Sequence, residues 1–216
     1  MACAQPLTAD PPPDNLQPRY NVAPTQDVMV VRLGKDGRRE AVRLRWGLIP
    51  GWAKDAGGAA KCINARAETV DTLPSFRSAF AKRRCLVLAS GFYEWKKIGK
   101  VEKQPYYISL KDASPMAFAG LWESWMSSRG PAVETCSIVT TKPNELLGPL
   151  HSRMPVILDE VDHARWLGQE PATVDELKAM LKPYPDDPMQ LWPVDRQVGS
   201  VKVDEPDLIK PEMVDT

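Results

Sequence analysis

The chain has 216 residues, of which 43% are hydrophobic and 26% are charged, a composition typical of one folded globular domain. Its formal net charge is zero, so overall charge predicts no class of partner. The sequence contains no apolar run long enough for a membrane span and no signal peptide, which argues against a membrane protein. We therefore expect a single domain over residues 1–216, located in the cytoplasm.

The first 18 residues are polar and rich in proline, which predicts irregular structure. A β-hairpin is predicted next, because two strand-like stretches flank the turn-forming residues 34–37. Gly57 and Gly58 mark a flexible loop. The stretches with strand-like composition are residues 27–33, 38–49, 84–96, 104–110, 116–122 and 135–141.

Two helical patterns follow, at residues 159–168 and 173–181. Thr173 and Glu176 have the spacing of a capping box at the start of the second helix. His163 falls in the first helix, where we expect it on the surface. Short closing strands are predicted at residues 192–194 and 198–203. This order predicts an α+β fold that is mostly strand, with the helices packed outside.

None of the four cysteines forms a Cys-x-x-Cys pair, so we expect no zinc site, no other metal and no cofactor. Free thiols suit a reducing cytosol. Cys3 lies near the start of the chain, where a terminal cysteine would have special chemistry. Its amine, with a pKa near 8, and its thiol, with a pKa of about 8.5, would both be partly nucleophilic. Such a pair condenses with an aldehyde to a thiazolidine, provided that no residue precedes the cysteine.

Basic residues cluster in two stretches, six of them within residues 32–45 and eight within residues 77–103. Local basic patches bind phosphates whatever the total charge. The alternative is that these side chains form ordinary solvated faces of strands. The seven tryptophans are likewise compatible with core packing or with stacking against bases.

Two residues are candidates for acid–base chemistry. His151 lies in an irregular polar stretch bounded by Pro149 and Pro155, a place where histidine can transfer protons. Glu94 lies between two aromatic residues at the end of an apolar strand, and apolar surroundings raise the pKa of a carboxyl group. The alternative for Glu94 is a half-exposed carboxylate paired with Lys96 or Lys97.

Residues 63–69 place Asn64, Arg66 and Glu68 at alternating positions. In an extended segment these three side chains share one face. They would then suit an anion or the edge of a base better than a core. The alternative is a turn with capping residues.

Six segments, taken together and in order, resemble the motifs of the SOS response-associated peptidase (SRAP) family. Each motif alone is short, but their common order over residues 19 to about 203 is specific. The segments are RYNVAPTQ (19–26), RWGLIPGW (45–52), INARAET (63–69), SGFYEW (90–95), HSRMP (151–155) and the closing run 194–202.

The resemblance implies an α+β fold built on a bifurcated sheet with a barrel-like centre and flanking helices. It implies a nucleoid-associated monomer that binds single-stranded DNA and single-strand/duplex junctions containing abasic sites. An N-terminal cysteine would capture the ring-opened aldehyde as a thiazolidine. Implied catalytic residues are Cys3, Asn64, Glu94 and His151, and implied DNA-binding residues are Arg66, Arg77, Arg153, Trp52 and Trp95.

The N-terminal end departs from the family pattern, in which Cys directly follows Met and precedes Gly-Arg. Here Ala2 stands before Cys3 and Ala4 follows it, and the interval to Arg19 is short. Removal of Ala2, for which self-processing is one route, would restore the reactive terminus. Two other functions stay open: a non-catalytic binder of single-stranded DNA, and a cysteine peptidase with Cys3 as nucleophile and His151 as base.

Overall fold

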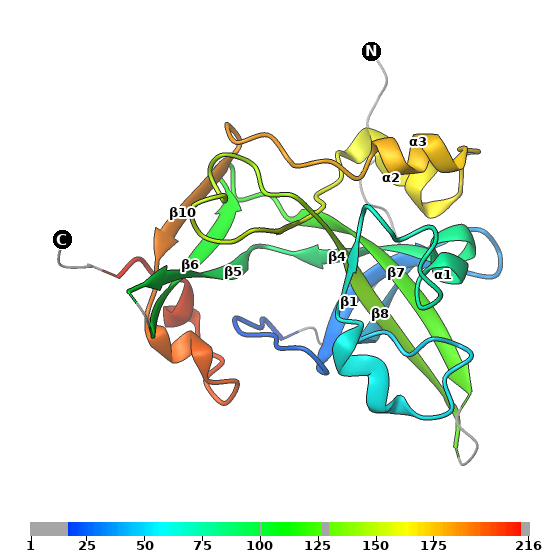
Figure 1. The fold of residues 1–216 in the computed structure, drawn as a ribbon, viewed down its shortest axis with the longest axis horizontal. Coiled ribbons are helices and arrows are strands. Elements are labelled where there is room, and N and C mark those ends of the chain that lie inside the picture. Colours follow the sequence, from blue (N-terminus) through cyan, green and yellow to red (C-terminus); the bar gives the residue numbers. More distant parts are fainter. Residues whose placement is uncertain (1–16, 100, 127–129, 213–216) are drawn as a thin grey trace.

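A computed structural model describes residues 17–99, 101–126 and 130–212 and contains two β-sheets (Figure 1). The larger sheet has the strand order β2-β1-β4-β7-β8-β3, with β9 paired to β8. Because β2 also pairs with β8, five of its strands close on themselves. Its strands are β1 (Asp27–Leu33), β2 (Arg39–Trp46), β3 (Asn64–Arg66), β4 (Arg84–Ala89), β7 (Met116–Met126), β8 (Ala132–Thr141) and β9 (Met154–Pro155).

The smaller sheet has the order β10-β6-β5 and lies beside the closed sheet (Figure 1). Its strands are β5 (Phe92–Ile98), β6 (Glu102–Leu110) and β10 (Met189–Pro193). The helices are α1 (Arg77–Lys82), α2 (Glu160–Leu167), α3 (Val174–Ala179) and the 3-10 helices η1 (Ala56–Lys61), η2 (Arg196–Gly199) and η3 (Pro206–Ile209). The predicted fold class, mostly strand with a barrel-like centre and flanking helices, is confirmed.

Two main hydrophobic clusters lie on the two faces of the strands. The first packs Phe80 of α1, Trp166 of α2 and Leu177 of α3 against the closed sheet. The second joins the closed sheet to the smaller one, since it contains Phe118 of β7 together with Ile108 of β6. Strand side chains alternate between faces, so β7 contributes to both clusters.

The chain turns from the closed sheet into the smaller sheet at Gly91, between β4 and β5. A β-carbon at this position would lie 2.2 Å from the ring of Tyr107 and 2.6 Å from the carbonyl oxygen of Ile108. Glycine is therefore required for the close approach of β6. The stretch 84–96, which has one continuous strand-like composition, is divided into two strands at this point.

Three local predictions were wrong, and one α-helix was missed. His163 is buried rather than on the surface, because it lies on the inner face of α2 with its Nε2 atom 3.2 Å from the carbonyl oxygen of Leu158. The predicted strand 198–203 is instead η2 and a turn, because Asp195 accepts a hydrogen bond from the backbone of Gln197 and starts a helical turn. Residues 57–58 lie inside η1, which Asp55 caps. Sequence pattern did not predict α1.

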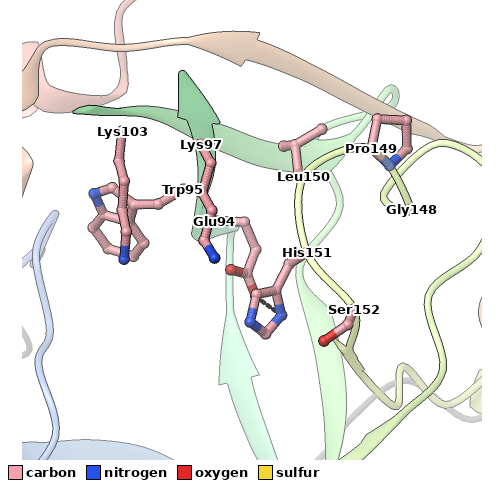
Figure 2. A pocket seen from close by; sticks show the side chains of 9 residues that line it. All are labelled: Glu94, Trp95, Lys97, Lys103, Gly148, Pro149, Leu150, His151 and Ser152. Carbon is pink, nitrogen blue, oxygen red and sulfur yellow. Dashed lines mark ion pairs between the residues drawn. The ribbon is translucent and has the colours of Figure 1, made fainter. Parts of the chain in front are cut away.

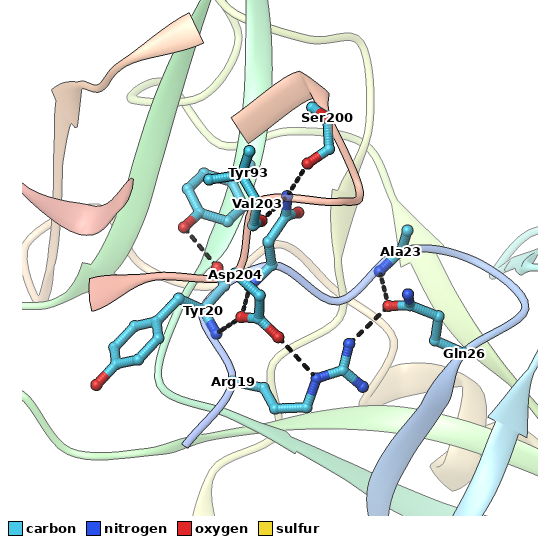
Figure 3. A network of polar contacts seen from close by, with 9 residues as sticks. Arg19, Tyr20, Ala23, Gln26, Tyr93, Ser200, Val203 and Asp204 are labelled. Carbon is cyan, nitrogen blue, oxygen red and sulfur yellow. Dashed lines mark hydrogen bonds and ion pairs between the residues drawn. The ribbon is translucent and has the colours of Figure 1, made fainter. Parts of the chain in front are cut away.

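The segment before β1 is bound to residues near the other end of the chain (Figure 3). The Asp204 carboxylate accepts hydrogen bonds from the side chain of Arg19 and from the backbone N–H groups of Tyr20 and Asn21. The buried Asn21 amide donates to the carbonyl oxygens of residues 198, 200 and 203, each at 3.0 Å. Tyr93 of β5 donates to the carbonyl oxygen of Tyr20. These bonds fix the position of residues 19–21 beside the smaller sheet.

Asn21→Asp is expected to lower the free energy of unfolding at neutral pH by more than about 3 kcal/mol, because it places a carboxylate against three carbonyl oxygens. Asn21→Ala only leaves acceptors unpaired, so its loss should be smaller, about 1–3 kcal/mol. The new carboxyl should have a raised folded-state pKa, so the Asp variant should regain stability as the pH falls below that pKa. Urea unfolding at pH 7 and pH 4 measures both effects. Equal stability of the wild type and the Asp variant at pH 7 would contradict the prediction.

Candidate functional site

A pocket of about 550 Å³ lies between the β5–β6 hairpin and the loop that precedes β9 (Figure 2). One wall comes from the hairpin and the other from residues 148–152. Acidic, basic, aromatic and imidazole side chains meet here, which is a combination suited to binding and proton transfer. The lining residues are Glu94, Trp95, Lys97, Lys103, Gly148, Pro149, Leu150, His151 and Ser152.

Glu94 is the carboxyl group of this pocket. Its side chain is 19% exposed, and its Oε1 atom lies 3.4 Å from Nδ1 of His151. Burial raises the pKa of Glu94, and the nearby His151 charge opposes this shift only in part. The protonated form of Glu94 therefore persists to higher pH than in a solvated glutamate. The pairing with His151 takes the place of the alternative pairing with Lys96 or Lys97.

His151 is held in position by the loop that leads to β9. Its backbone N–H donates to the carbonyl oxygen of Leu147, and its Nδ1 atom lies 3.0 Å from the carbonyl oxygen of Arg153. When Nδ1 carries a proton, it donates to that oxygen, and the free lone pair is on Nε2. With a side chain that is 48% exposed, His151 can exchange a proton through Nε2 with a molecule in the pocket.

Arg153 connects this loop to β3. Its guanidinium group forms two hydrogen bonds with the Glu68 carboxylate, at 2.7 and 3.0 Å, and a third with the carbonyl oxygen of Thr140. The hydrogen bonds from Arg153 lower the pKa of Glu68. Thr140 pairs with Arg66 across the β3–β8 ladder. The INARAET and HSRMP segments therefore meet in space, although about 80 residues separate them in the sequence.

The predicted site residues fall into three groups. Glu94, Trp95 and His151 line the same pocket, and Arg153 is joined to it through its contact with His151. The others do not line the pocket: Asn64 and Arg66 are exposed on β3, Arg77 is exposed at the start of α1, and Trp52 is 67% exposed and donates to the carbonyl oxygen of Pro74. Cys3 lies outside the described residues.

Several arginines of the two basic stretches are structural. Arg32 forms ion pairs with Glu40 and Glu134, and Arg83 forms one with the buried Glu123. Arg84 donates to backbone carbonyl oxygens of α1 and α2. For these side chains, the interpretation as phosphate-binding patches has less support than a role in holding the fold together.

Sequence pattern did not single out Lys97 and Lys103, which also line the pocket. The hairpin could have indicated both lysines. Alternation along β5 places Lys97 on the same side as Trp95, and the turn at Gly99 places Lys103 opposite Lys97. In the part of the chain that the structure describes, no group of three His, Cys, Asp or Glu side chains is arranged for a metal ion, and no helix is long and apolar enough to cross a membrane.

Comparison with known proteins decides the family. The model of the SOS response associated peptidase (SRAP) family matches residues 2–201. The chain belongs to the SRAP family. It is 43% identical over 199 residues to the abasic site processing protein YoqW of Bacillus subtilis, covering 92% of this chain and 88% of that protein. It is 31% identical to the abasic site processing protein HMCES of Mus musculus, covering 92% of this chain and 66% of that protein.

A solved structure agrees with the fold described above. The crystal structure of a protein from Bacteroides thetaiotaomicron has a TM-score of 0.77 and 30% sequence identity, covering 91% of this chain and 82% of that one. The family resemblance inferred from the six sequence segments is thereby confirmed.

Proposed function

We propose that this SRAP protein captures abasic sites in single-stranded DNA and at single-strand/duplex junctions by forming a covalent thiazolidine link. The observation that carries the proposal is the Glu94–His151 pair, at 3.4 Å, in a pocket that also contains lysines and a tryptophan. Relatives at 43% and 31% identity are named abasic site processing proteins, which supports the substrate class.

Proton transfer is the first requirement of this chemistry. The sugar of an abasic site is mainly a closed ring, and opening it to the aldehyde needs a proton on the ring oxygen and removal of one from the hydroxyl group. A Glu94 with raised pKa donates the first proton, and Nε2 of His151 accepts the second. These transfers leave a Glu94 carboxylate beside a His151 imidazolium, and their proximity, 3.4 Å between Oε1 and Nδ1, stabilises this pair of opposite charges.

Capture of the aldehyde then requires Cys3 as the first residue. Its α-amine adds to the aldehyde carbon, the adduct loses one water molecule, and a Schiff base forms. The thiolate attacks the same carbon, and the amine nitrogen keeps one proton. The net reaction forms one C–N and one C–S bond and releases one water. Removal of the residues before Cys3, by the protein's own peptidase activity or another route, belongs to this proposal.

The remaining predicted residues have roles in holding the strand. Asn64 positions the opened sugar, and the phosphates are contacted by Arg66, Arg77 and Arg153. Arg153 keeps its pairing with Glu68 when it contacts a phosphate. Exposed Trp52 and Trp95 suit stacking with bases, because stacking tolerates any base sequence. A bare single-strand binder would not need a half-buried carboxyl group beside a histidine, so the pocket favours the catalytic function over the non-catalytic one.

The direct test is a denaturing gel of the protein, with its first residue verified by mass, mixed with single-stranded DNA. An oligonucleotide with a natural abasic site should give a band of protein attached to DNA. The same oligonucleotide with a tetrahydrofuran analogue has no aldehyde and should bind without crosslinking. A crosslink to both, or to neither when Cys3 is shown to be the first residue, contradicts the proposed chemistry.

A further inference from the structure

Two lysines face each other on the hairpin that forms one wall of the pocket. In the antiparallel β5–β6 pair, Lys97 lies directly opposite Lys103. Both line the pocket that contains Glu94 and His151, and their side chains extend from the hairpin in the same direction (Figure 2). Lys96, between Trp95 and Lys97 on the same strand, is exposed but does not line the pocket.

This arrangement has an electrostatic cost in the free protein, because like charges directly opposite in an antiparallel pair destabilise the sheet. The cost is not offset internally: over residues 17–99, 101–126 and 130–212, neither ammonium group has a carboxylate oxygen within 4 Å. The neighbouring Glu102 approaches Arg196 instead, at 3.8 Å, and Glu94 pairs with His151. An external anion between the two lysines would reduce their repulsion and receive hydrogen bonds from both.

The pocket also defines what kind of anion fits. Trp95 lies beside the lysines, 37% exposed, and offers an aromatic face next to the positive charge. A phosphate with a base attached through its sugar matches both features, since ammonium groups bind its oxygens and the aromatic ring stacks on the base. A free inorganic anion would use the lysines and leave the tryptophan face without a partner.

We propose that Lys97 and Lys103 form a subsite for one backbone phosphate next to the abasic nucleotide. The inference rests on the proposed function, because it places the abasic sugar at Glu94 and His151. Held there, the phosphate sets the position of the strand along the pocket and directs the sugar toward the proton-transfer pair. The subsite adds two residues to the predicted strand contacts and makes β5–β6 part of the DNA-binding surface.

Binding measurements test the charge pair separately from the covalent chemistry. Anisotropy titrations use single-stranded DNA with a tetrahydrofuran analogue, which cannot crosslink. Each neutralised phosphate contributes about 0.7 to the slope of log K against log salt for single strands, so K97A/K103A should bind several-fold more weakly with a slope smaller by about 0.7. K96A removes one charge from the same hairpin outside the pocket and should keep the wild-type slope. K97R/K103R should restore binding.

A neutral-linkage scan locates the phosphate. One methylphosphonate at a time replaces a phosphodiester along the strand. In the wild type, the linkage next to the analogue should weaken binding, and in K97A/K103A the same replacement should have no further effect. Replacements elsewhere should weaken both proteins alike. The proposal is overturned if K96A loses as much slope as K97A/K103A, or if no flanking linkage is coupled to the lysine pair. Because no crosslink is needed, either result is independent of whether the thiazolidine forms.

Discussion

Glu94→Gln and His151→Ala are each expected to slow covalent capture of an abasic site by about a hundredfold to ten-thousandfold, the usual contribution of a general acid or base. Both side chains line the pocket, and Glu94 has an environment that favours its protonated form. Neither side chain is among the residues proposed to contact phosphates, so affinity for undamaged single strands should stay near the wild-type value. Single-turnover gels give the rate, and anisotropy gives the affinity.

The matched control is Glu102→Gln, which makes the same chemical change on the neighbouring strand outside the pocket. It should leave the capture rate unchanged. The pH profile separates a chemical role from a structural one. Because the pKa of Glu94 is raised, its acid form is present at low pH and is lost as the pH rises through that raised value. The wild-type rate should show this descending limb, and Glu94→Gln should lack it. Wild-type rates in both pocket variants would show that the assigned roles are wrong.

Local sequence patterns predicted most of the strands, because strands such as β4 and β7 contribute to both hydrophobic clusters and are therefore apolar runs rich in strand-forming residues. The hairpin of β1 and β2, the start of β7 and the capping box of Thr173 and Glu176 all depend on neighbours in the sequence, and all are confirmed. The family motifs also picked out two side chains that the structure brings together, since Glu94 and His151 line one pocket although they lie 57 positions apart in the sequence.

Features that depend on tertiary contacts could not be predicted from the pattern. His163 occupies a helix with polar neighbours, but its side of α2 faces the core. Residues 198–203 have valines at strand-like spacing, yet Asp195 and the carbonyl bonds from Asn21 hold them in turns. The pairing of Arg153 with Glu68 depends on β8, which pairs with β3 along one edge and with β9 along the other, at the same residue, Thr140. A charge count along the chain likewise did not distinguish lysines that line a pocket from arginines that form ion pairs within the sheet.

The proposed thiazolidine depends on which residue is the first of the chain. A thiazolidine needs the amine and the thiol on one residue, so a protein that retains Ala2 before Cys3 is expected to bind abasic DNA without forming a heat-stable crosslink. A thiol alone gives a labile hemithioacetal, and an amine alone stops at a Schiff base that hydrolyses. A variant whose first residue is Cys3 should crosslink, and the loss in the Ala2 form should be complete.

Three preparations test this expectation, each with its first residue established by intact mass: Ala2 retained, Cys3 first, and Cys3→Ser first. Only the second should give a band that survives heating on a denaturing gel with abasic single-stranded DNA. The noncovalent affinity should be the same in all three, because the pocket and the lysine pair do not change. Cys62→Ser in the Cys3-first protein is the matched thiol control, since Cys62 is half-buried whereas Cys85 and Cys136 are buried. A stable crosslink from the form that retains Ala2 would refute the terminal-cysteine mechanism and point to Cys62 or a lysine, and the Cys62→Ser change made in that form would distinguish the two.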